Sequence, residues 1–301
     1  MYRSRVKIDR VSEQLDPDPS RVIPRFFGPG DEKRLRGIIG RIRALDRSEA
    51  SNLLSGLKRS FRKKHPDLAA IARSNYGAVK HLISDEHDLD EERRLLIGAY
   101  FTMEYAIESA ALFNPSMVPA IVQDAAAEGS TRFLMSLRAT GEGHISSVVF
   151  RRGVIDCHNR IHIEPVSQYS RQLQVIENRQ FEKKIYRKKL IEMGAFGPSI
   201  DEVLNRLGET FNFAELNLVI DTVRESHDPA RFFSDTTSSM IALTRANYDL
   251  HIPDLDDPSE FVIFPNSEAE SKGIEDMRMV LFRFDDGEVC YYGVYTAYDG
   301  S

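Results

Sequence analysis

The hydrophobic period of this 301-residue chain changes several times, and this succession most constrains its fold. Apolar residues recur every three or four positions in a helix and alternate in a half-buried strand. Leu35, Ile38, Ile39 and Ile42 follow the helical period, whereas strand-like runs begin near Thr131. The sequence therefore predicts an α+β fold in which helical and strand-rich regions alternate.

A helical N-terminal region is expected over residues 31–112, after an extended lead-in over residues 1–30. Ser48 is the expected N-cap of a second helix, because serine oxygens accept hydrogen bonds from the first-turn amides. Further helices are expected over about 67–83 and 89–112, the last beginning after an acidic run that suits the positive end of a helix dipole.

Strands are expected over residues 113–169, where 132–138 and 144–150 lie on either side of Gly141-Glu142-Gly143. Residues 160–164 read as a third strand. Alternating apolar residues around a short glycine-rich turn are typical of hairpins. We therefore expect a β-meander in this region.

A helical insert is expected over residues 170–250, with Ser199 as one of its helix caps. Strands resume over residues 251–301, and Asp-Gly between the apolar runs 277–284 and 289–296 predicts a hairpin. Meanders on both sides of an insert are typical of propeller blades. Because the chain stops on turn residues just after a strand, we expect a fragment with little activity of its own.

Composition narrows the class of partner. The net charge of −6 disfavours general nucleic-acid binding, which needs a basic surface. No apolar run approaches the roughly 20 residues of a membrane helix, and the N-terminus lacks an apolar signal core, so a cytoplasmic location is expected. Cys157 and Cys290 lack metal-ligand spacing, and neither a metal nor an organic cofactor is expected. The composition leaves open whether the chain forms a homo-oligomer.

Two polar segments lie near the first predicted strands. Asn114 and Ser116 flank a proline, which suits either a helix stop with an Asx turn or a functional loop. Arg138 ends a strand, where its guanidinium can fork two hydrogen bonds to sugar hydroxyls or to an anion. Glu142 and His144 in the next turn are further candidates, although a turn-stabilising role or a solvated surface hairpin explains this segment equally well.

Near the C-terminus two adjacent carboxylates, Glu275 and Asp276, are followed by Arg278. On a regular strand Asp276 and Arg278 share one face and Glu275 takes the other. A general acid needs a carboxyl that burial or negative charge keeps protonated near neutral pH. Arg278 would oppose this unless it is committed elsewhere, and the alternative is a charged loop before an edge strand. The strand ending near Tyr298 is either a core strand or a stacking platform for sugar.

The order of these segments resembles glycoside hydrolase family 130, which contains mannoside phosphorylases and some mannosidases. Its members show Phe-Asn-Pro, an arginine near the end of an early strand, a Glu-Asp-Pro-Arg block and a Tyr-Thr-Ala-Tyr-Asp-Gly-like strand. Here the last two read Glu275-Asp276-Met277-Arg278 and Tyr295-Thr296-Ala297-Tyr298-Asp299-Gly300, with Met277 in place of the proline. The resemblance covers roughly residues 105–165 and 260–301, and implies part of a five-bladed β-propeller with its active site in the central channel.

The resemblance also implies site residues. Asp276 matches the proton donor, Glu275 and Arg278 its neighbours, and Arg138 a sugar-contacting arginine. Asn114 and Ser116 match the family's motif near the sugar at the cleavage site. The family's phosphate-binding basic residues would be expected beyond Asp299.

The expected activity is inverting phosphorolysis of a β-mannoside, with Asp276 as general acid and inorganic phosphate as co-substrate. This places the chain among the glycosidases and glycosyltransferases of carbohydrate metabolism, with an oligosaccharide or mannoside as substrate. Two alternatives stay open. One is a β-mannoside hydrolase on the same scaffold, which needs a second carboxylate about 6.5–9.5 Å from the acid; the other is a non-catalytic interaction module.

Overall fold

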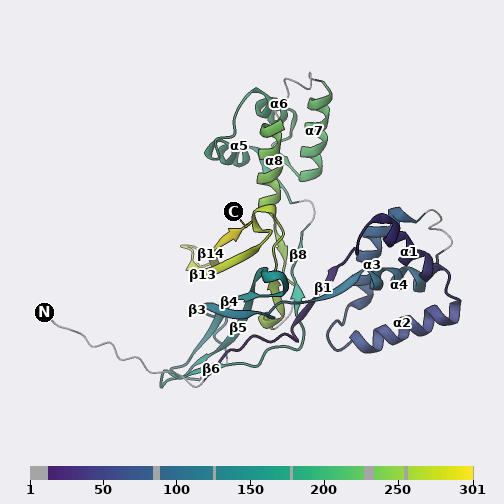
Figure 1. The fold of residues 1–301 in the computed structure, drawn as a ribbon. Helices are drawn as coiled ribbons and strands as arrows, with labels where there is room; N and C mark the ends of the chain where they lie inside the picture. The colour runs from purple at the N-terminus through teal and green to yellow at the C-terminus, as the bar shows by residue number, and fades with distance from the viewer. Residues whose placement is uncertain are drawn as a thin grey trace. The chain divides into compact units, whose positions relative to one another are not determined.

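A computed structural model describes residues 13–83, 89–124, 127–176, 179–226, 234–253 and 257–300 (Figure 1). These residues contain helices α1 to α8 and strands β1 to β14, which confirms the predicted α+β class. Two compact units can be separated. The first comprises the described parts of 1–172, 257–263 and 275–296, and the second those of 173–256, 264–274 and 297–301.

Four helices make up the helical part of the first unit. They are α1 (Glu32–Arg43), α2 (Arg47–Phe61), α3 (Leu68–Val79) and α4 (Glu91–Tyr100). Aspartates cap three of them: Asp31, Asp46 and Asp90 each accept a hydrogen bond from the backbone N–H three residues on. The prediction that Ser48 caps the second helix was wrong. Asp46 does so in a reciprocal box with Glu49, and Ser48 lies inside the first turn.

The core of these helices is apolar and tightly packed. Leu54, Leu96 and Phe101 are buried in it. Helices α3 and α4 meet at Gly98, where an added Cβ would lie 1.8 Å from the carbonyl oxygen of Ala72. Only glycine allows this backbone approach, because a Cβ there would overlap the oxygen.

The predicted helix over 89–112 was wrong in its second half. Helix α4 ends at Tyr100, and β2 (Thr102–Ala106) follows. Strand β2 pairs antiparallel with β1 (Val22–Phe26), from Val22↔Ala106 to Phe26↔Thr102. The partner strand lies about eighty positions earlier, so a non-local ladder overrides the local helical pattern.

Eight strands form one mixed sheet. They are β3 (Ala111–Pro119), β4 (Thr131–Thr140), β5 (Ser146–Ile155), β6 (Ile161–Ile163), β7 (Arg171–Gln172), β12 (Phe261–Ile263), β13 (Gly273–Arg283) and β14 (Val289–Tyr298). The order is β14-β13-β5-β12-β7, with β4 also on β5 and β3 on β4. The antiparallel run β4 to β6 confirms the predicted meander, and β3, which was not predicted as a strand, pairs with β4 at its side. The turn before β14 closes the predicted hairpin through Gly287 N–H and the Phe284 carbonyl.

A buried ionic triad lies beside this meander. Glu108 is fully buried between two buried arginines. One of its oxygens is 3.1 Å from Arg21 Nε and 2.8 Å from Arg151 Nη2. Since buried charges need partners, the three side chains stabilise one another and each depends on the rest.

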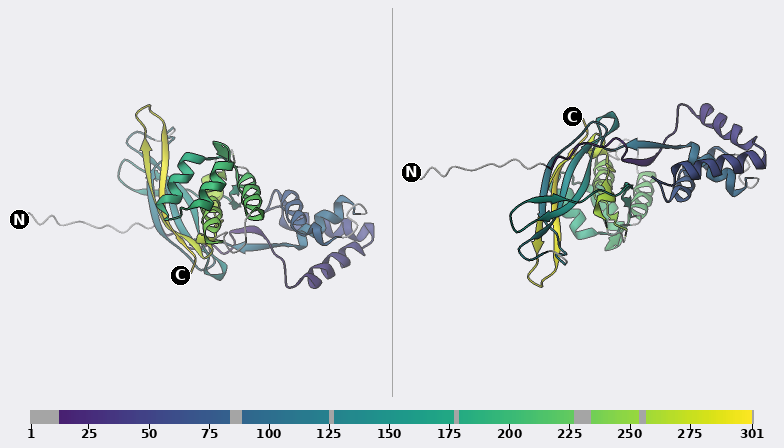
Figure 2. Two further views of the ribbon diagram at one scale, coloured as in Figure 1. Left: turned by 90° about the horizontal axis from the view of Figure 1, so that it is seen from above. Right: turned by 90° about the horizontal axis from the view of Figure 1, so that it is seen from below.

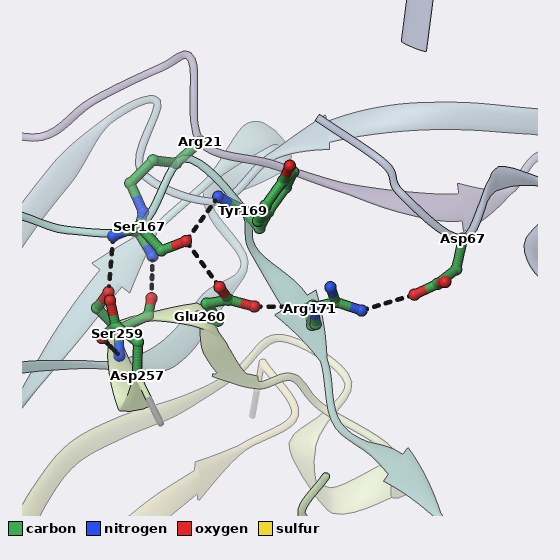
Figure 3. Close-up of polar contacts among 8 residues, drawn as sticks. All are labelled: Arg21, Asp67, Ser167, Tyr169, Arg171, Asp257, Ser259 and Glu260. Carbon is green, nitrogen blue, oxygen red and sulfur yellow. Dashed lines mark hydrogen bonds and ion pairs between the residues drawn. The ribbon is translucent and has the colours of Figure 1, made fainter. Parts of the chain in front are cut away.

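A second polar network fixes the segment before β7 (Figure 3). Ser167 Oγ donates to Glu260 Oε1 at 2.8 Å, and Arg171 Nε donates to Glu260 Oε2 at 2.9 Å. Arg171 also donates to Asp67, the residue before α3, at 2.6 Å. One arginine therefore joins a short 3-10 turn (Pro258–Glu260) to the helical part of the same unit.

The second unit contains α5 (Lys183–Glu192), α6 (Pro198–Arg206), α7 (Phe213–Glu225) and α8 (Ser234–Ala246). Its core includes mutually packed rings of Phe181, Tyr186 and Phe211. Helices do not begin near residue 170 as predicted, since short strands β8 (Gln174–Val175) and β9 (Phe181–Glu182) precede them. These pair with β11 (Leu250–His251) and β10 (Thr210–Phe211).

Ser199 was also wrongly predicted as a cap. Helix α6 begins at Pro198, the residue before it, and Gly197 occupies the cap position. Proline suits a first helical position because its missing N–H would have no partner there. Within the part of the chain that the structure describes, no helix combines the length and apolarity needed to cross a membrane.

Candidate functional site

Strands β3, β4 and β13 bring all six residues of the main predicted site together. Arg138 on β4 lies at the centre. Its Nη2 forms an ion pair with Glu275, and its Nη1 is 3.4 Å from Asp276 Oδ1. Its Nε donates to Ser146 Oγ at 2.9 Å. The arginine therefore holds two carboxylates from a strand more than 130 positions later in the chain.

The β3–β4 register places an aromatic ring under this arginine. Phe113 is paired directly with Arg138, and the guanidinium carbon lies 5.0 Å from the ring centroid. A cation over an aromatic face is attracted by the ring quadrupole. Phe113 and Ser146 were not among the predicted site residues. Strand register carries the missing signal, since it sets Phe113 opposite Arg138 and puts Ser146 at the start of the neighbouring strand.

Asn114 and Asp276 meet directly. Asn114 Nδ2 donates a hydrogen bond of 2.6 Å to Asp276 Oδ1. Both residues have a backbone φ of 52°, in the left-handed region that glycine favours and that asparagine and aspartate enter more often than other side chains. Two such conformations in contact store strain that the surrounding strands must offset, and strain of this kind gathers at functional sites.

A bulge in β3 produces one of these conformations. The register of β3 against β4 shifts between Phe113 and Ser116, so Asn114 and Pro115 stand outside the ladder. A bulge re-aims a side chain out of the regular alternation. Asn114 is thereby directed at Asp276 on β13.

Ser116 and Arg278 connect the same two strands, one contact lying within the bulge and one just after it. Arg278 Nη1 donates to the carbonyl oxygen of Pro115 at 2.8 Å, and the backbone N–H of Met279 donates to Ser116 Oγ at 2.9 Å. The prediction treated both as substrate contacts. In this structure they position β3 against β13.

The predicted separation of Glu275 and Asp276 onto opposite faces was wrong. Both carboxylates contact Arg138. Strict alternation requires extended backbone at every position. The left-handed φ of Asp276 breaks that alternation and turns its carboxylate to the same side as that of Glu275.

The hydrogen bond from Asn114 lowers the pKa of the Asp276 carboxyl below its usual value, with Arg138 and Arg278 adding positive charge nearby. Asp276 is therefore ionised near neutral pH in this state. The Asp276 side chain is 43% exposed, whereas those of Arg138 and Glu275 are 19% and 21% exposed. Of these three ion-paired side chains, Asp276 is thus the most open to a ligand.

The contacts of the other three candidates are of a different kind. Glu142 and His144 form a 3-10 turn (Glu142–His144), where Tyr105 donates to the Glu142 carbonyl at 2.7 Å and His144 N–H to the Gly141 carbonyl at 3.1 Å. These contacts are those of a structural turn. Tyr298 belongs to the second unit, and its carbonyl oxygen accepts from Lys272 N–H at 2.8 Å.

Over the described ranges, no group of three or more His, Cys, Asp or Glu side chains is arranged to hold a metal ion. The chain as a whole matches no protein-family model, no curated protein and no solved structure.

Proposed function

We propose that the group around Arg138 is the sugar-binding and catalytic centre of a β-mannoside phosphorylase. One observation carries the proposal. Asn114 and Asp276, singled out from the order of short motifs 162 positions apart, share a hydrogen bond and the same strained backbone conformation. Sparsely populated backbone conformations of this kind cluster at active sites, which supports a functional role for the pair.

In this proposal Asp276 protonates the leaving oxygen, directly or through a sugar hydroxyl, while phosphate attacks the opposite face of the ring. The C–O bond to the leaving sugar breaks and a new C–O bond to phosphate forms with inversion, giving mannose 1-phosphate. The low pKa of Asp276 opposes proton donation in the empty site. A bound phosphate dianion would raise that pKa, since a nearby negative charge favours the protonated carboxyl.

Arg138 then serves to orient the acid, because its fork holds both carboxylates while leaving Asp276 partly open. The finer fold proposed is a five-bladed β-propeller, to which the eight-stranded sheet contributes strands. A β-mannoside hydrolase is the second candidate. It rests on the same residues and requires a further carboxylate to activate water.

The test is binding and turnover of a β-1,4-mannobiose by the 301-residue chain. We expect binding, and slow release of mannose 1-phosphate that occurs only when phosphate is present. Asp276→Asn should keep binding and lower turnover by at least about 10²-fold, the usual contribution of a positioned acid. Asp285→Asn, in the turn of the same hairpin, is the matched control and should behave as wild type.

Binding separates the outcomes even if turnover by this chain is slow. Equal sugar release without phosphate would replace the phosphorylase by the hydrolase. No mannoside binding by the wild type, or binding that Asn114→Ala and Arg138→Ala leave unchanged, would favour a non-catalytic interaction module and end the proposal.

A further inference from the structure

Positive charge is concentrated in the segment that contains the first three helices. Residues 31–83 include thirteen Lys and Arg but only five Asp and Glu, a net charge of +8. The whole chain carries −6, so the residues outside this segment carry −14. Charge of one sign on a small segment repels itself, and such asymmetry indicates an anionic partner for the segment.

Helix α2 turns one face of this segment to solvent. Its core face consists of buried or half-buried apolar residues: Ala50, Leu54, Leu57 and Phe61. Its outward face has the same spacing of three and four, which keeps residues on one side of a helix. That face is exposed throughout and consists of Ser48, Asn52, Ser55, Arg59 and, at the C-cap, Arg62. Figure 2 shows α2 as one continuous helix at the margin of the four-helix group.

Four cations gather where this outward face ends: Lys58, Arg59, Arg62 and Lys63. All four are exposed, and among the described residues no carboxylate lies within ion-pair distance of them, whereas the next residue, Lys64, pairs with Glu104 at 3.5 Å. The Arg62 N–H donates to the Lys58 carbonyl at 3.1 Å, so these like charges lie one turn apart and repel each other. The helix dipole offsets part of this repulsion, and a bound anion would offset the rest.

The composition of the outward face narrows the class of anion. Bilayer binding needs an apolar face, and a protein interface has an apolar core. The outward face has no apolar residue, and of the large apolar side chains of α2, which the structure describes in full, only Leu53 at one flank is exposed. A nucleic-acid duplex carries a charge about every 1.7 Å, and the −14 outside the segment would repel it.

Serine, asparagine and arginine together suit a polymer that bears both hydroxyls and scattered anionic groups. Serine and asparagine exchange hydrogen bonds with hydroxyls, and arginine forks two hydrogen bonds to a carboxylate. Beside the outward face runs a groove of about 610 Å³, lined in part by Asn52, Leu53 and Gly56, along which an extended chain can lie.

We infer that the outward face of α2 binds an acidic polysaccharide, with the carboxylates of the polymer at Arg59 and Arg62 and its hydroxyls at the serines and Asn52. The inference rests on the proposed function, for which it names the class of polymer that presents the mannoside.

The test is binding of β-1,4-linked polymannuronate to the 301-residue chain, with neutral β-1,4-mannan as the uncharged reference. We expect polymannuronate to bind more tightly, and to bind less tightly as salt is added. Arg59→Ser with Arg62→Ser should raise the dissociation constant at least about tenfold, through two lost charge contacts. The matched control is Arg34→Ser with Arg41→Ser, which removes two exposed arginines of α1 in the same basic segment and should bind within about twofold of wild type.

Both double variants change exposed side chains, and thermal unfolding verifies that each is folded. Wild type that does not bind polymannuronate, or binds neutral mannan equally well, overturns the inference. So do equal losses in the two double variants, which would mean that only net charge matters. Tighter binding of a short DNA duplex, of polyglutamate or of phosphatidylserine vesicles would replace the polysaccharide by another partner.

Uncharged mannobiose separates this inference from the proposed function. A chain that binds mannobiose but not polymannuronate keeps the proposed function and loses the site on α2. A chain that binds polymannuronate through Arg59 and Arg62 but does not bind mannobiose keeps the site on α2 and loses the proposed function.

Discussion

Asn114 donates to Asp276 across 162 positions of sequence, with both backbones left-handed at the point of contact. The contact couples the charge of the carboxylate to the shape of the bulge in β3. Each residue therefore has two separable properties, a backbone conformation and a polar group, and substitutions can remove one without the other.

Asn114→Gly removes the amide and keeps the left-handed backbone, which glycine adopts freely. We expect the pKa of Asp276 to rise towards its usual value, because the hydrogen bond from Asn114 is the main cause of its lowering. A carboxyl-detected NMR titration measures the shift. Asn159→Gly is the control, since Asn159 also has a positive φ, of 60°, and lies in a different turn. An unchanged Asp276 titration would show that Asn114 does not set this pKa.

Acid should weaken the fold in part through Asp276. Its folded pKa lies below the unfolded value of about 3.8. The unfolded state then binds the proton more readily, so the ionised form stabilises the protein above that pH, and the stabilisation disappears as pH falls through the folded pKa. Urea unfolding at about pH 6 and about pH 3 should show wild type losing more free energy than Asp276→Asn. Equal losses of unfolding free energy in the two proteins would contradict a contribution from Asp276.

Arg138→Lys should destabilise the protein by about 1–2 kcal/mol, because one ammonium cannot replace hydrogen bonds to Ser146, Glu275 and Asp276. Arg132→Lys is a suitable comparison. Arg132 lies on the same strand and contacts one carboxylate, Glu164, at 3.2 Å. Chemical denaturation should find a clearly smaller loss for that variant, and equal losses would argue against the central position of Arg138.

Glu108→Gln should cost about 3 kcal/mol of unfolding free energy, because it removes the only carboxylate that forms an ion pair with both buried arginines, Arg21 and Arg151, among the described residues. Glu164 also pairs with two arginines, but its side chain is 30% exposed. Glu164→Gln should therefore lower the free energy of unfolding by no more than about 1 kcal/mol. Thermal and urea unfolding measure both. A small effect at Glu108 would mean that water reaches the triad.

Gly98→Ala should destabilise the helical part of the first unit by about 2 kcal/mol or more, since the new methyl group overlaps the Ala72 carbonyl. Gly56→Ala should instead be neutral or stabilising by up to about 1 kcal/mol, because Gly56 lies in α2 with open space around it. Unfolding curves that rank the two variants in the opposite order would refute the close contact.

Local patterns predicted the elements whose stabilising contacts are close in sequence. The hairpin before β14 and the meander β4 to β6 follow from turn residues between alternating runs. Strand β2 was missed because its partner β1 lies far away, and no window around Thr102 contains that information. The short strands β8 and β9 were missed for the same reason.

The site shows the same division. Motif order brought Asn114, Arg138 and Asp276 into one hypothesis, and the structure places them in contact. The sequence did not predict their relative orientation, because the left-handed backbone of Asp276 places Glu275 and Asp276 on the same side of the strand, contrary to the regular alternation of side chains. The hydrogen bond from Arg278 to the Pro115 carbonyl was not predicted either, since a bulge in another strand exposes that carbonyl.

The spacing of these three strands also sets an order of events during synthesis. Strands β3 and β4 leave the ribosome long before β13, so Arg138 is exposed without its carboxylates while the whole second helical group is made. Contacts of such high sequence separation form slowly and late. A nascent chain halted before Glu275 would therefore hold a folded meander in which Arg138 has no carboxylate partner, and the arrival of β13 would extend the sheet and supply both carboxylates.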